Sequence, residues 1–481
     1  MNYKKVFSTL GMMLVALSAL LVLPIIVAIV YRETALWGFV TVAGCSLCVG
    51  GLMTVFFRTD NQVIYAKEGF AITALSWLVL SAVGALPFYI TGEIPSYIDA
   101  LFETVSGFTT TGASIVTEVM AMSRSCLFWR SFTHWVGGMG VLVFVMAIIP
   151  NLSDRSIHLM RAEMPGPIVG KLVPKAKDTA KILYIIYIVM TAVEVIFLLA
   201  GGMSLFDSLV HSFGTAGTGG FGIKADSIGG YSPYIQWVIT IFMFLFGINF
   251  NLYYLILIKK FKSVFKSSEL WCYVAIVATS TAAITANIFK MCNGFGEALR
   301  LAAFQVSSII TTTGYTTTDF NLWPTLSKAI LLILMFIGGC AGSTAGGLKV
   351  SRVIILGKAM GKEIRQMLRP RSVNTVKFEG KQIEDSTLRN CTTYFSLYML
   401  CFVVLFLLLC AIENYDFETN FMAVSACFNN VGPGFGAVGP TSNFDGYSDV
   451  STLALTFAML LGRLEIFPLI ITLSPSTWTK R

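Results

Sequence analysis

Long apolar runs with few or no charges recur along the chain. Eight of them reach the length of a membrane span, and they cover residues 10–30, 36–57, 70–90, 182–200, 233–258, 270–289, 391–412 and 450–473. A helix needs about 20 apolar residues to cross a bilayer, whereas barrel strands are about ten residues long and alternate in polarity. The pattern therefore predicts an all-α polytopic membrane protein. The first run contains Pro24 and lacks a small-x-small cleavage pattern after it, so we expect it to remain as a span.

Composition supports a membrane location. Of 481 residues, 55% are hydrophobic and only 12% are charged, with a mean hydropathy of +0.74. A soluble globular protein has about a quarter of its residues charged. The ten cysteines lie mostly within apolar runs, and we interpret Cys45 and Cys48 as packed thiols rather than a redox or zinc pair. The net charge of +8 follows the membrane topology, so we expect no nucleic-acid binding.

Charged residues divide the segments between the runs into two classes. Basic clusters occur at Lys4 and Lys5; at Arg155, Arg161, Lys171, Lys175, Lys177 and Lys181; at Lys259, Lys260, Lys262 and Lys266; and from Lys349 to Arg389. The other segments carry acids, namely Glu93, Asp99, Glu118, Asp226, Asp319, Asp416, Asp445 and Asp449. The positive-inside rule assigns the basic segments, and with them both termini, to the cytoplasm. An acidic outer face would concentrate cations at an entrance, although an ordinary solvated loop has the same composition.

Four segments are too polar for lipid and too apolar for ordinary loops. They cover residues 99–112, 207–220, 301–314 and 419–432, and they align without gaps, each joining a short amphipathic run to a cluster that ends in glycine. Non-helical backbone at membrane depth is tolerated only where it lines water or is buried in protein. Four unrelated turns would not be expected to align in this way, so the pattern indicates four helix, re-entrant loop and helix repeats.

The loop ends have the chemistry needed to dehydrate a cation. Backbone carbonyls and threonine hydroxyls can replace the hydration shell of the ion, and glycine allows the unusual dihedral angles. The dipole of each short helix favours a cation at its C-terminal end. The candidate filter residues are Thr110, Thr111 and Gly112; Thr218, Gly219 and Gly220; Thr312, Thr313 and Gly314; and Asn430, Val431 and Gly432.

A glycine-rich break and an intramembrane arginine indicate a gate. Residues 338–347 include Gly338, Gly339, Gly342, Gly346 and Gly347, and each glycine costs a helix about 1 kcal/mol relative to alanine. Gly338 lies as many residues past Pro324 as Arg463 lies past Asp449, so both should lie at one depth below the filter. An arginine inside a membrane is costly and must face protein or water. Arg463 could bond loop carbonyls and repel cations, or it could form a structural ion pair with Glu194 or Glu465.

Other motifs do not support nucleotide binding, a metal site or catalysis. The segment 217–222 fits G-x-G-x-x-G but has no preceding strand, and residues 338–347 lack the Gly-Lys-Ser/Thr of a phosphate loop. His134, His158 and His211 are far apart. His211 aligns with Glu103 and Gln305, and we interpret these positions as braces for the filter, although Glu103 could instead be a permeation charge. The pattern contains no nucleophile with a neighbouring base.

The chain resembles the Trk/Ktr/HKT superfamily of potassium transporters. The resemblance rests on the four loops closed by Gly112, Gly220, Gly314 and Gly432, and on the segments THWVGGMG at 133–140, GGCAGSTAGG at 338–347 and GRLEI at 462–466. Two additional N-terminal spans make it similar to the bacterial TrkH branch. In plant relatives a serine at the first filter glycine accompanies sodium transport, and Gly112 keeps the potassium-like pattern. The second and fourth loops depart from Thr-x-Gly regularity, which favours a single, less stringent site.

The resemblance implies an organisation and a set of partners. Each subunit would hold a complete pore, two subunits would pair as a homodimer in the bacterial inner membrane, and a cytosolic TrkA-type nucleotide-binding subunit would regulate opening. Potassium would be the transported ion, no nucleotide would bind this chain, and membrane lipid would surround it.

The predicted organisation has five parts. Residues 1–66 form two extra N-terminal spans, 67–178 the first pore repeat with a cytoplasmic loop, 179–267 the second repeat, 268–390 the third repeat with the loop 338–347 and a cytoplasmic segment, and 391–481 the fourth repeat. A potassium channel or transporter subunit is the favoured function. The alternatives are sodium conduction or cation/proton symport, for which Glu103, Glu194 and Glu465 are the titratable candidates, and a polytopic membrane enzyme, for which no motif is present.

Overall fold

Helices make up nearly all of the regular structure in the computed structural model, which describes residues 1–59, 66–140, 176–371 and 374–479. The α-helices are α1 (Tyr3–Tyr31), α2 (Leu36–Phe56), α3 (Ala66–Ile90), α4 (Tyr97–Phe108), α5 (Arg124–Gly138), α8 (Ala176–Ala200), α9 (Leu205–Gly217), α10 (Pro233–Phe246), α11 (Phe250–Leu257), α12 (Phe261–Phe265), α13 (Ser268–Ile288), α14 (Phe295–Ile310), α15 (Thr325–Ile337), α16 (Val350–Leu368), α17 (Asp385–Ile412), α18 (Phe417–Phe428), α19 (Asp449–Arg463), α20 (Phe467–Leu473) and α21 (Pro475–Trp478). Short 3-10 turns occur at Val119–Ala121, Phe289–Met291, Phe320–Leu322 and Gly436–Val438, and two short strands, β1 (Lys377–Phe378) and β2 (Lys381–Gln382), complete the set.

The long helices confirm the prediction of an all-α polytopic membrane protein. Within the described residues, six helices, α1, α2, α3, α8, α13 and α17, are long and apolar enough to cross a membrane. The pairs α10–α11 and α19–α20 raise the total to eight if each bent pair is one span. Large apolar side chains on the outer helices are exposed, Trp37 with 73% of its surface, as expected where lipid replaces water.

Two runs that read as continuous spans are sharply bent. The run 233–258 breaks between α10 and α11 with an angle of 90°, and the run 450–473 breaks between α19 and α20 with an angle of 117°. At the first break the side chain of Asn249 accepts a hydrogen bond from the backbone N–H of Asn251 and caps α11. At the second, Glu465 and Ile466 adopt positive φ angles and Pro468 starts α20, where its missing N–H has no cost. Hydropathy alone does not register these local caps.

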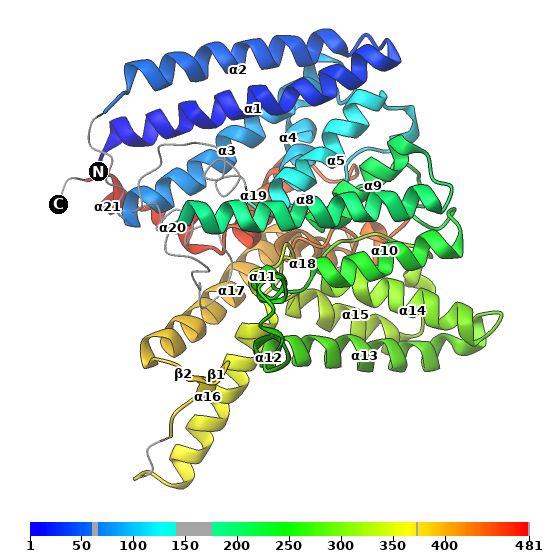
Figure 1. Cartoon of the computed structure of the whole chain (residues 1–481), viewed down its shortest axis with the longest axis vertical. Helices are drawn as coiled ribbons and strands as arrows, with labels where there is room; N and C mark the ends of the chain where they lie inside the picture. The colour runs from blue at the N-terminus through cyan, green and yellow to red at the C-terminus, as the bar shows by residue number, and fades with distance from the viewer. Residues whose placement is uncertain (60–65, 141–175, 372–373, 480–481) are drawn as a thin grey trace.

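Four short helices, α4, α9, α14 and α18, lie within the bundle (Figure 1). The helices α1 and α2 pack on the outside, where Gly11 and Gly50 let the backbones meet. A Cβ atom at Gly50 would lie 2.7 Å from the carbonyl oxygen of Gly11, so only glycine permits this approach.

The two ends of the chain lie together, at the end of the bundle from which α16 and the strands extend (Figure 1). The rings of Tyr3 and Trp478 stack with centroids 6.3 Å apart. Strands β1 and β2 form an antiparallel hairpin in which Lys377 pairs with Gln382, and its turn residues Glu379 and Gly380 both have positive φ. This geometry is that of a type I′ turn.

Some predictions fall outside the described residues or stay untested. The basic residues Arg155, Arg161, Lys171 and Lys175, together with His158, lie outside the described part of the chain. The division into five parts stays a prediction. Helices α8 and α17 begin at Ala176 and Asp385, slightly before the predicted boundaries at 178/179 and 390/391, because a polar first turn precedes each apolar run.

Candidate functional site

The four loop ends share one backbone conformation. Thr110, Thr218, Thr312 and Asn430, each two residues before the closing glycine, have φ angles of 55°, 56°, 56° and 56°. The glycines themselves, Gly112, Gly220, Gly314 and Gly432, have φ angles of 79°, 77°, 85° and 97°. A left-handed conformation is unusual for threonine, which carries a branched Cβ, so its occurrence at equivalent positions indicates a shared structural constraint.

The closing glycines bring the loops together in a ring. A Cβ atom would lie 2.0 Å from the Gly219 carbonyl oxygen if it were on Gly112, and 2.0 Å from that of Thr313 if it were on Gly220. On Gly314 it would lie 2.2 Å from the Val431 oxygen, and on Gly432 it would lie 2.7 Å from the Thr111 oxygen. Loop one therefore meets loop two, two meets three, three meets four, and four returns to one. The candidate filter residues are assembled around one axis.

The ring is rich in oxygen atoms and poor in free donors. The N–H groups of Thr111, Gly219, Thr313 and Val431 donate back to carbonyls of their own short helices at 2.8–2.9 Å. Among the described residues, the hydroxyl of Thr110 has no hydrogen-bond partner although it is fully buried. Carbonyl and hydroxyl oxygens at the C-terminal ends of the four short helices, where the helix dipole favours positive charge, form an environment suited to a cation.

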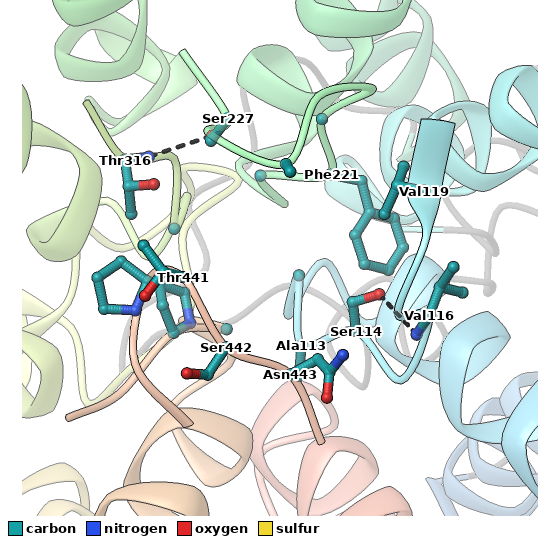
Figure 2. Close-up of a pocket in the computed structure, with 18 of the residues that line it drawn as sticks. Ala113, Ser114, Val116, Val119, Phe221, Ser227, Thr316, Thr441, Ser442 and Asn443 are labelled. Atoms are coloured by element: carbon teal, nitrogen blue, oxygen red, sulfur yellow. Dashed lines mark hydrogen bonds between the residues drawn. The ribbon is translucent and has the colours of Figure 1, made fainter. Parts of the chain in front are cut away.

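A cavity of about 160 Å³ lies on one side of the ring, and Figure 2 shows its lining. All four closing glycines border this cavity. The residues labelled in the figure come from the segments that follow each glycine, including Ser114, Phe221, Thr316 and Thr441. These segments carry backbone and hydroxyl oxygens, so the cavity is a polar vestibule that opens onto the ring.

A buried ion pair between Arg130 and Glu103 supports the first two loops. The guanidinium of Arg130 bonds the carboxylate of Glu103, the hydroxyl of Ser114 at 2.9 Å and the carbonyl of Gly222 at 3.0 Å. Glu103 also accepts the backbone N–H of Ile115 at 2.9 Å. This geometry is that of a brace behind the loops, as sequence reasoning proposed for Glu103. Sequence reasoning missed Arg130, although an arginine inside an apolar bundle was a usable signal.

Rings on neighbouring helices hold the second and third loops. His134 donates from Nδ1 to the carbonyl of Gly107 at 2.8 Å and accepts at Nε2 from the N–H of Phe221 at 3.3 Å, which makes it a neutral imidazole. The hydroxyl of Tyr315 donates to the carbonyl of His211 at 3.1 Å. The side chain of Gln305 is buried and has no partner among the described residues, so it makes no hydrogen-bonded brace there.

The fourth loop replaces threonine with asparagine. Asn430 donates from Nδ2 to the hydroxyl of Thr111 and to the carbonyl of Met459, both at 2.9 Å. Asn429 donates to the carbonyl of Ser425 at 3.0 Å and accepts from the hydroxyl of Tyr398. These amides tie loop four to loop one and to α19, which threonine hydroxyls are too short to do.

Residues 338–347 form a loop that contacts the underside of the ring. Gly338, Gly342 and Gly347 have φ angles of 73°, 72° and 73°. The N–H of Gly346 donates to the hydroxyl of Thr312 at 2.6 Å, and a Cβ atom there would lie 2.7 Å from the Asn429 carbonyl oxygen. Gly339 lies near the carbonyl of Gly247 at the α10–α11 break. The broken helix predicted here is confirmed, and its glycines are needed both for dihedral angles and for close approach.

Arg463 joins this loop to the end of α5. It donates to the carbonyl of Thr344 at 2.8 Å and to the carbonyls of Gly137 and Gly138, each at 2.7 Å. The last carbonyls of a helix carry partial negative charge and lack intrahelical partners, so they suit a guanidinium. The ion pair considered for Arg463 is not the arrangement seen, because Glu465 pairs instead with Arg352 at 2.8 Å.

Two basic residues assigned to the cytoplasmic cluster are buried beneath the loop. Lys349 is 1% exposed, has a φ of 77° and donates from Nζ to the carbonyl of Ala345. Arg352 is 5% exposed and lies 4.0 Å from the centre of the Tyr394 ring. The positive-inside rule located the segment but could not separate these two residues from their solvated neighbours.

The described residues contain no cluster of three or more His, Cys, Asp or Glu side chains able to hold a metal ion. The ten cysteines are all free thiols. The interpretation of Cys45 and Cys48 as packed thiols is wrong, because both are exposed on the outer helix α2. The ring of four loop ends and the loop 338–347 beneath it are therefore the candidate functional site.

Comparison with known proteins gives a consistent result. Residues 39–480 match the family model TrkH, described as cation transport protein. The chain is 36% identical to the Trk system potassium uptake protein TrkH of Escherichia coli K12 over 99% of this chain and 100% of that protein. It is also 36% identical to the Trk system potassium uptake protein TrkG of the same strain, over 95% of this chain and 94% of that protein. The crystal structure of the potassium transporter TrkH from Vibrio parahaemolyticus superposes with a TM-score of 0.89 at 33% identity, covering 100% of both chains.

We expect Arg130→Met to destabilise the protein. The change leaves Glu103 buried without its partner, a loss of about 3–5 kcal/mol for a buried pair. The control is Lys328→Met, which removes the partly exposed pair with Glu418 at 3.5 Å and should change stability by less than about 1 kcal/mol. Free energies of unfolding in detergent check this, and equal small losses in both variants would contradict the bracing role.

Proposed function

Because the chain belongs to the TrkH family of cation transport proteins, we propose that it is a potassium uptake protein that conducts K⁺ through the ring of four loops. The family is one of transporters, which sets aside the polytopic membrane enzyme. The observation that carries this proposal is the closed order of glycine-to-carbonyl contacts around the ring. A ring of carbonyl oxygens replaces the hydration shell of a cation, and four converging helix C-termini add favourable partial charge.

The proposed selectivity filter consists of Thr110, Thr111 and Gly112 with their counterparts in the other three loops. K⁺ would enter from the vestibule bordered by the closing glycines. Because the fourth loop contains Asn430 and Val431 in place of two threonines, the oxygen pattern is not fourfold identical. This asymmetry favours one main ion site rather than a column of equivalent sites. Such a site would discriminate only moderately between K⁺ and Na⁺.

The proposed gate consists of the loop 338–347 and Arg463. The loop occupies the space under the filter, and the guanidinium of Arg463 adds positive charge there. Two unit charges 4 Å apart interact by about 4 kcal/mol at an effective dielectric constant of 20, so a fixed guanidinium raises a substantial barrier to K⁺. Opening requires the loop and the Arg463 contacts to part.

The proposed setting is the bacterial inner membrane, with both termini in the cytoplasm. The relatives are named as components of the Trk system, which supports assembly with further Trk components. We propose a homodimer regulated by a cytosolic TrkA-type nucleotide-binding subunit. The exposed basic residues of α16 and the segment after it are the candidate docking surface for that regulator.

Sodium conduction or cation/proton symport is the second candidate. One observation favours the symport version: Glu194 is completely buried, and neither carboxyl oxygen has a hydrogen-bond partner among the described residues. Such a carboxyl could carry a proton. Glu103 and Glu465 are weaker candidates because each is paired with an arginine.

Flux through the purified protein in liposomes tests the function. We expect K⁺ and Rb⁺ to pass faster than Na⁺, with the same K⁺ reversal potential whether or not a pH gradient is imposed. Dissipation of the pH gradient by K⁺ uptake would favour symport, and equal rates for Na⁺ and K⁺ would contradict the proposed filter. Empty liposomes serve as the control.

We predict that Gly112→Ser weakens the preference for K⁺ over Na⁺. The new Cβ would lie 2.0 Å from the Gly219 carbonyl oxygen, and Gly112 has a φ of 79°, so the ring must widen. A tenfold decrease in the ratio of K⁺ to Na⁺ permeability corresponds to a free-energy change of about 1.4 kcal/mol. Gly44→Ser on the outer face of α2, where a Cβ meets nothing within 4 Å, is the control. An unchanged ratio at normal protein levels would count against the filter assignment.

We predict that Arg463→Ala raises basal K⁺ flux without a regulatory subunit. The substitution removes a charge and the bond to the loop, and lowering the barrier by about 1.4 kcal/mol raises the rate about tenfold. Deleting several glycines from residues 338–347 should have the same effect, while Arg463→Lys keeps the charge and serves as the control. Selectivity should change little. Wild-type flux in both well-folded variants would make Arg463 a structural residue.

We predict that charge reversal of Lys358, Lys362, Arg365, Arg369 and Arg371 abolishes binding of a TrkA-type subunit in a pull-down. These side chains lie on or just after α16, and their attraction to an acidic partner should weaken as salt rises. Reversal of Lys259, Lys260, Lys262 and Lys266 is the matched control on the same predicted side. Undiminished binding after the first set of changes would move the interface elsewhere.

A further inference from the structure

A buried glutamate holds the middle of the loop 338–347 at Ala341, whereas Arg463 bonds the loop at Thr344. Glu269, in the first turn of α13, is 5% exposed and accepts the backbone N–H of Ala341 at 2.7 Å. The neighbouring backbone groups are tied to the α10–α11 break, where Cys340 donates to the carbonyl of Gly247 and Phe250 donates to that of Gly342, both at 3.0 Å. Three consecutive loop residues are therefore fixed by contacts outside the loop.

The contact with Glu269 is the one among these that a side chain supplies. A buried N–H that loses its acceptor bears the full cost of desolvation, and bonds to carboxylates are stronger than those between neutral groups. Gly342 follows in a left-handed conformation with a φ of 72°, and glycine adopts many other conformations once its neighbour Ala341 is no longer held. Loss of this acceptor should free the loop at its centre.

The position of Glu269 depends in turn on the cytoplasmic hairpin. One carboxylate oxygen of Glu379 accepts the N–H of Glu269 at 3.0 Å and the hydroxyls of Ser267 and Ser268, each at 3.1 Å. Glu379 is therefore an acid at the N-terminus of α13, where the helix dipole favours it. Its turn directs it toward α13, while Phe378 and Ile383 anchor the hairpin in a small core with Ile355.

These contacts link the loop, α16, the hairpin and α13 in a closed order. The loop continues directly into α16, α16 leads to the hairpin, Glu379 at the hairpin turn binds the start of α13, and Glu269 returns to the loop. Any force that moves α16 and the hairpin relative to α13 must pull on Glu379. The cytoplasmic surface and the intramembrane loop are thus joined by two carboxylates as well as by the continuous backbone of α16.

We propose that Glu269 is the positioning residue that keeps the loop 338–347 beneath the filter, and that Glu379 releases it when the cytoplasmic hairpin moves. The inference rests on the proposed gating function of the loop. In this proposal α13 holds the loop at Ala341, a contact that neither the filter nor Arg463 makes. The first tests are Glu269→Ala, which removes the acceptor, and Glu269→Gln, whose amide oxygen can still accept the N–H of Ala341.

The native thiol of Cys340 reports loop position independently of flux. Cys340 is fully buried in the loop, so a water-soluble thiol reagent should modify it slowly in the intact protein. Labelling of Cys340 is measured as the total thiol labelling of each variant minus that of the same variant carrying Cys340→Ala. We expect Glu269→Ala to raise both Cys340 labelling and basal K⁺ flux by about tenfold or more, where tenfold corresponds to about 1.4 kcal/mol. We expect Glu269→Gln to raise both by less than about threefold, because its amide oxygen still accepts the N–H of Ala341.

Glu379→Ala tests the proposed link between the hairpin and α13 at an exposed residue. It should increase Cys340 labelling and flux by a smaller factor than Glu269→Ala, whereas Lys381→Ala, exposed on the same hairpin, should leave both unchanged. If Glu379→Ala behaves like Lys381→Ala, the hairpin does not control the loop and that half of the proposal is overturned.

The variants distinguish a failure of the role proposed for Glu269 from a failure of the proposed gate. If Arg463→Ala raises flux but Glu269→Ala leaves both flux and Cys340 labelling at wild-type values, the gate stands and the role of Glu269 is overturned. If Glu269→Ala exposes Cys340 while neither it nor Arg463→Ala raises flux, the loop is not the gate, and the gating role of Glu269 is overturned with it. Equal increases for Glu269→Gln and Glu269→Ala would also contradict the hydrogen-bond mechanism.

Discussion

The contact between each closing glycine and the carbonyl of the next loop is the constraint on which the rest of the structure depends. At three of the four positions a Cβ atom would approach that oxygen to 2.2 Å or less, which no side chain allows. The loops can close only if glycine occupies each position and if the residue two before it accepts a left-handed conformation. The strain in Thr110, Thr218, Thr312 and Asn430 follows from this closure.

A ring under this constraint needs support from outside. The short helices aim their C-terminal ends at the centre, and their own carbonyls accept the loop N–H groups. Behind them Arg130 and Glu103 tie loops one and two, Tyr315 ties loops two and three, and Asn430 ties loop four to loop one. Each brace uses a different chemistry because the four loops differ in sequence. The ring is nearly fourfold in backbone and asymmetric in side chains.

Basic side chains below the ring are likewise held by hydrogen bonds to backbone carbonyls. Arg463 bonds carbonyls from the loop and from the end of α5, while Lys349 bonds a carbonyl of the loop itself. The paired arginines, Arg130 with Glu103 and Arg352 with Glu465, instead link elements through carboxylates.

The spans, the four aligned loops and the glycine-rich break could be predicted from the sequence, and most of the candidate site followed from them. These features depend on residues close together in the chain, such as the length of an apolar run or glycine at a left-handed position. The three-dimensional arrangement was needed to show which loop meets which, that Lys349 and Arg352 are buried, that Arg130 bonds Glu103 behind the loops and that Glu269 reaches Ala341. The bend at α10–α11 belongs to this second group, because the carbonyl of Gly247 and the N–H of Phe250 find partners in the loop 338–347. The physical reason is that a buried charge or unpaired backbone group is tolerated only where a partner lies in space, and hydropathy records how apolar a segment is without recording what it touches.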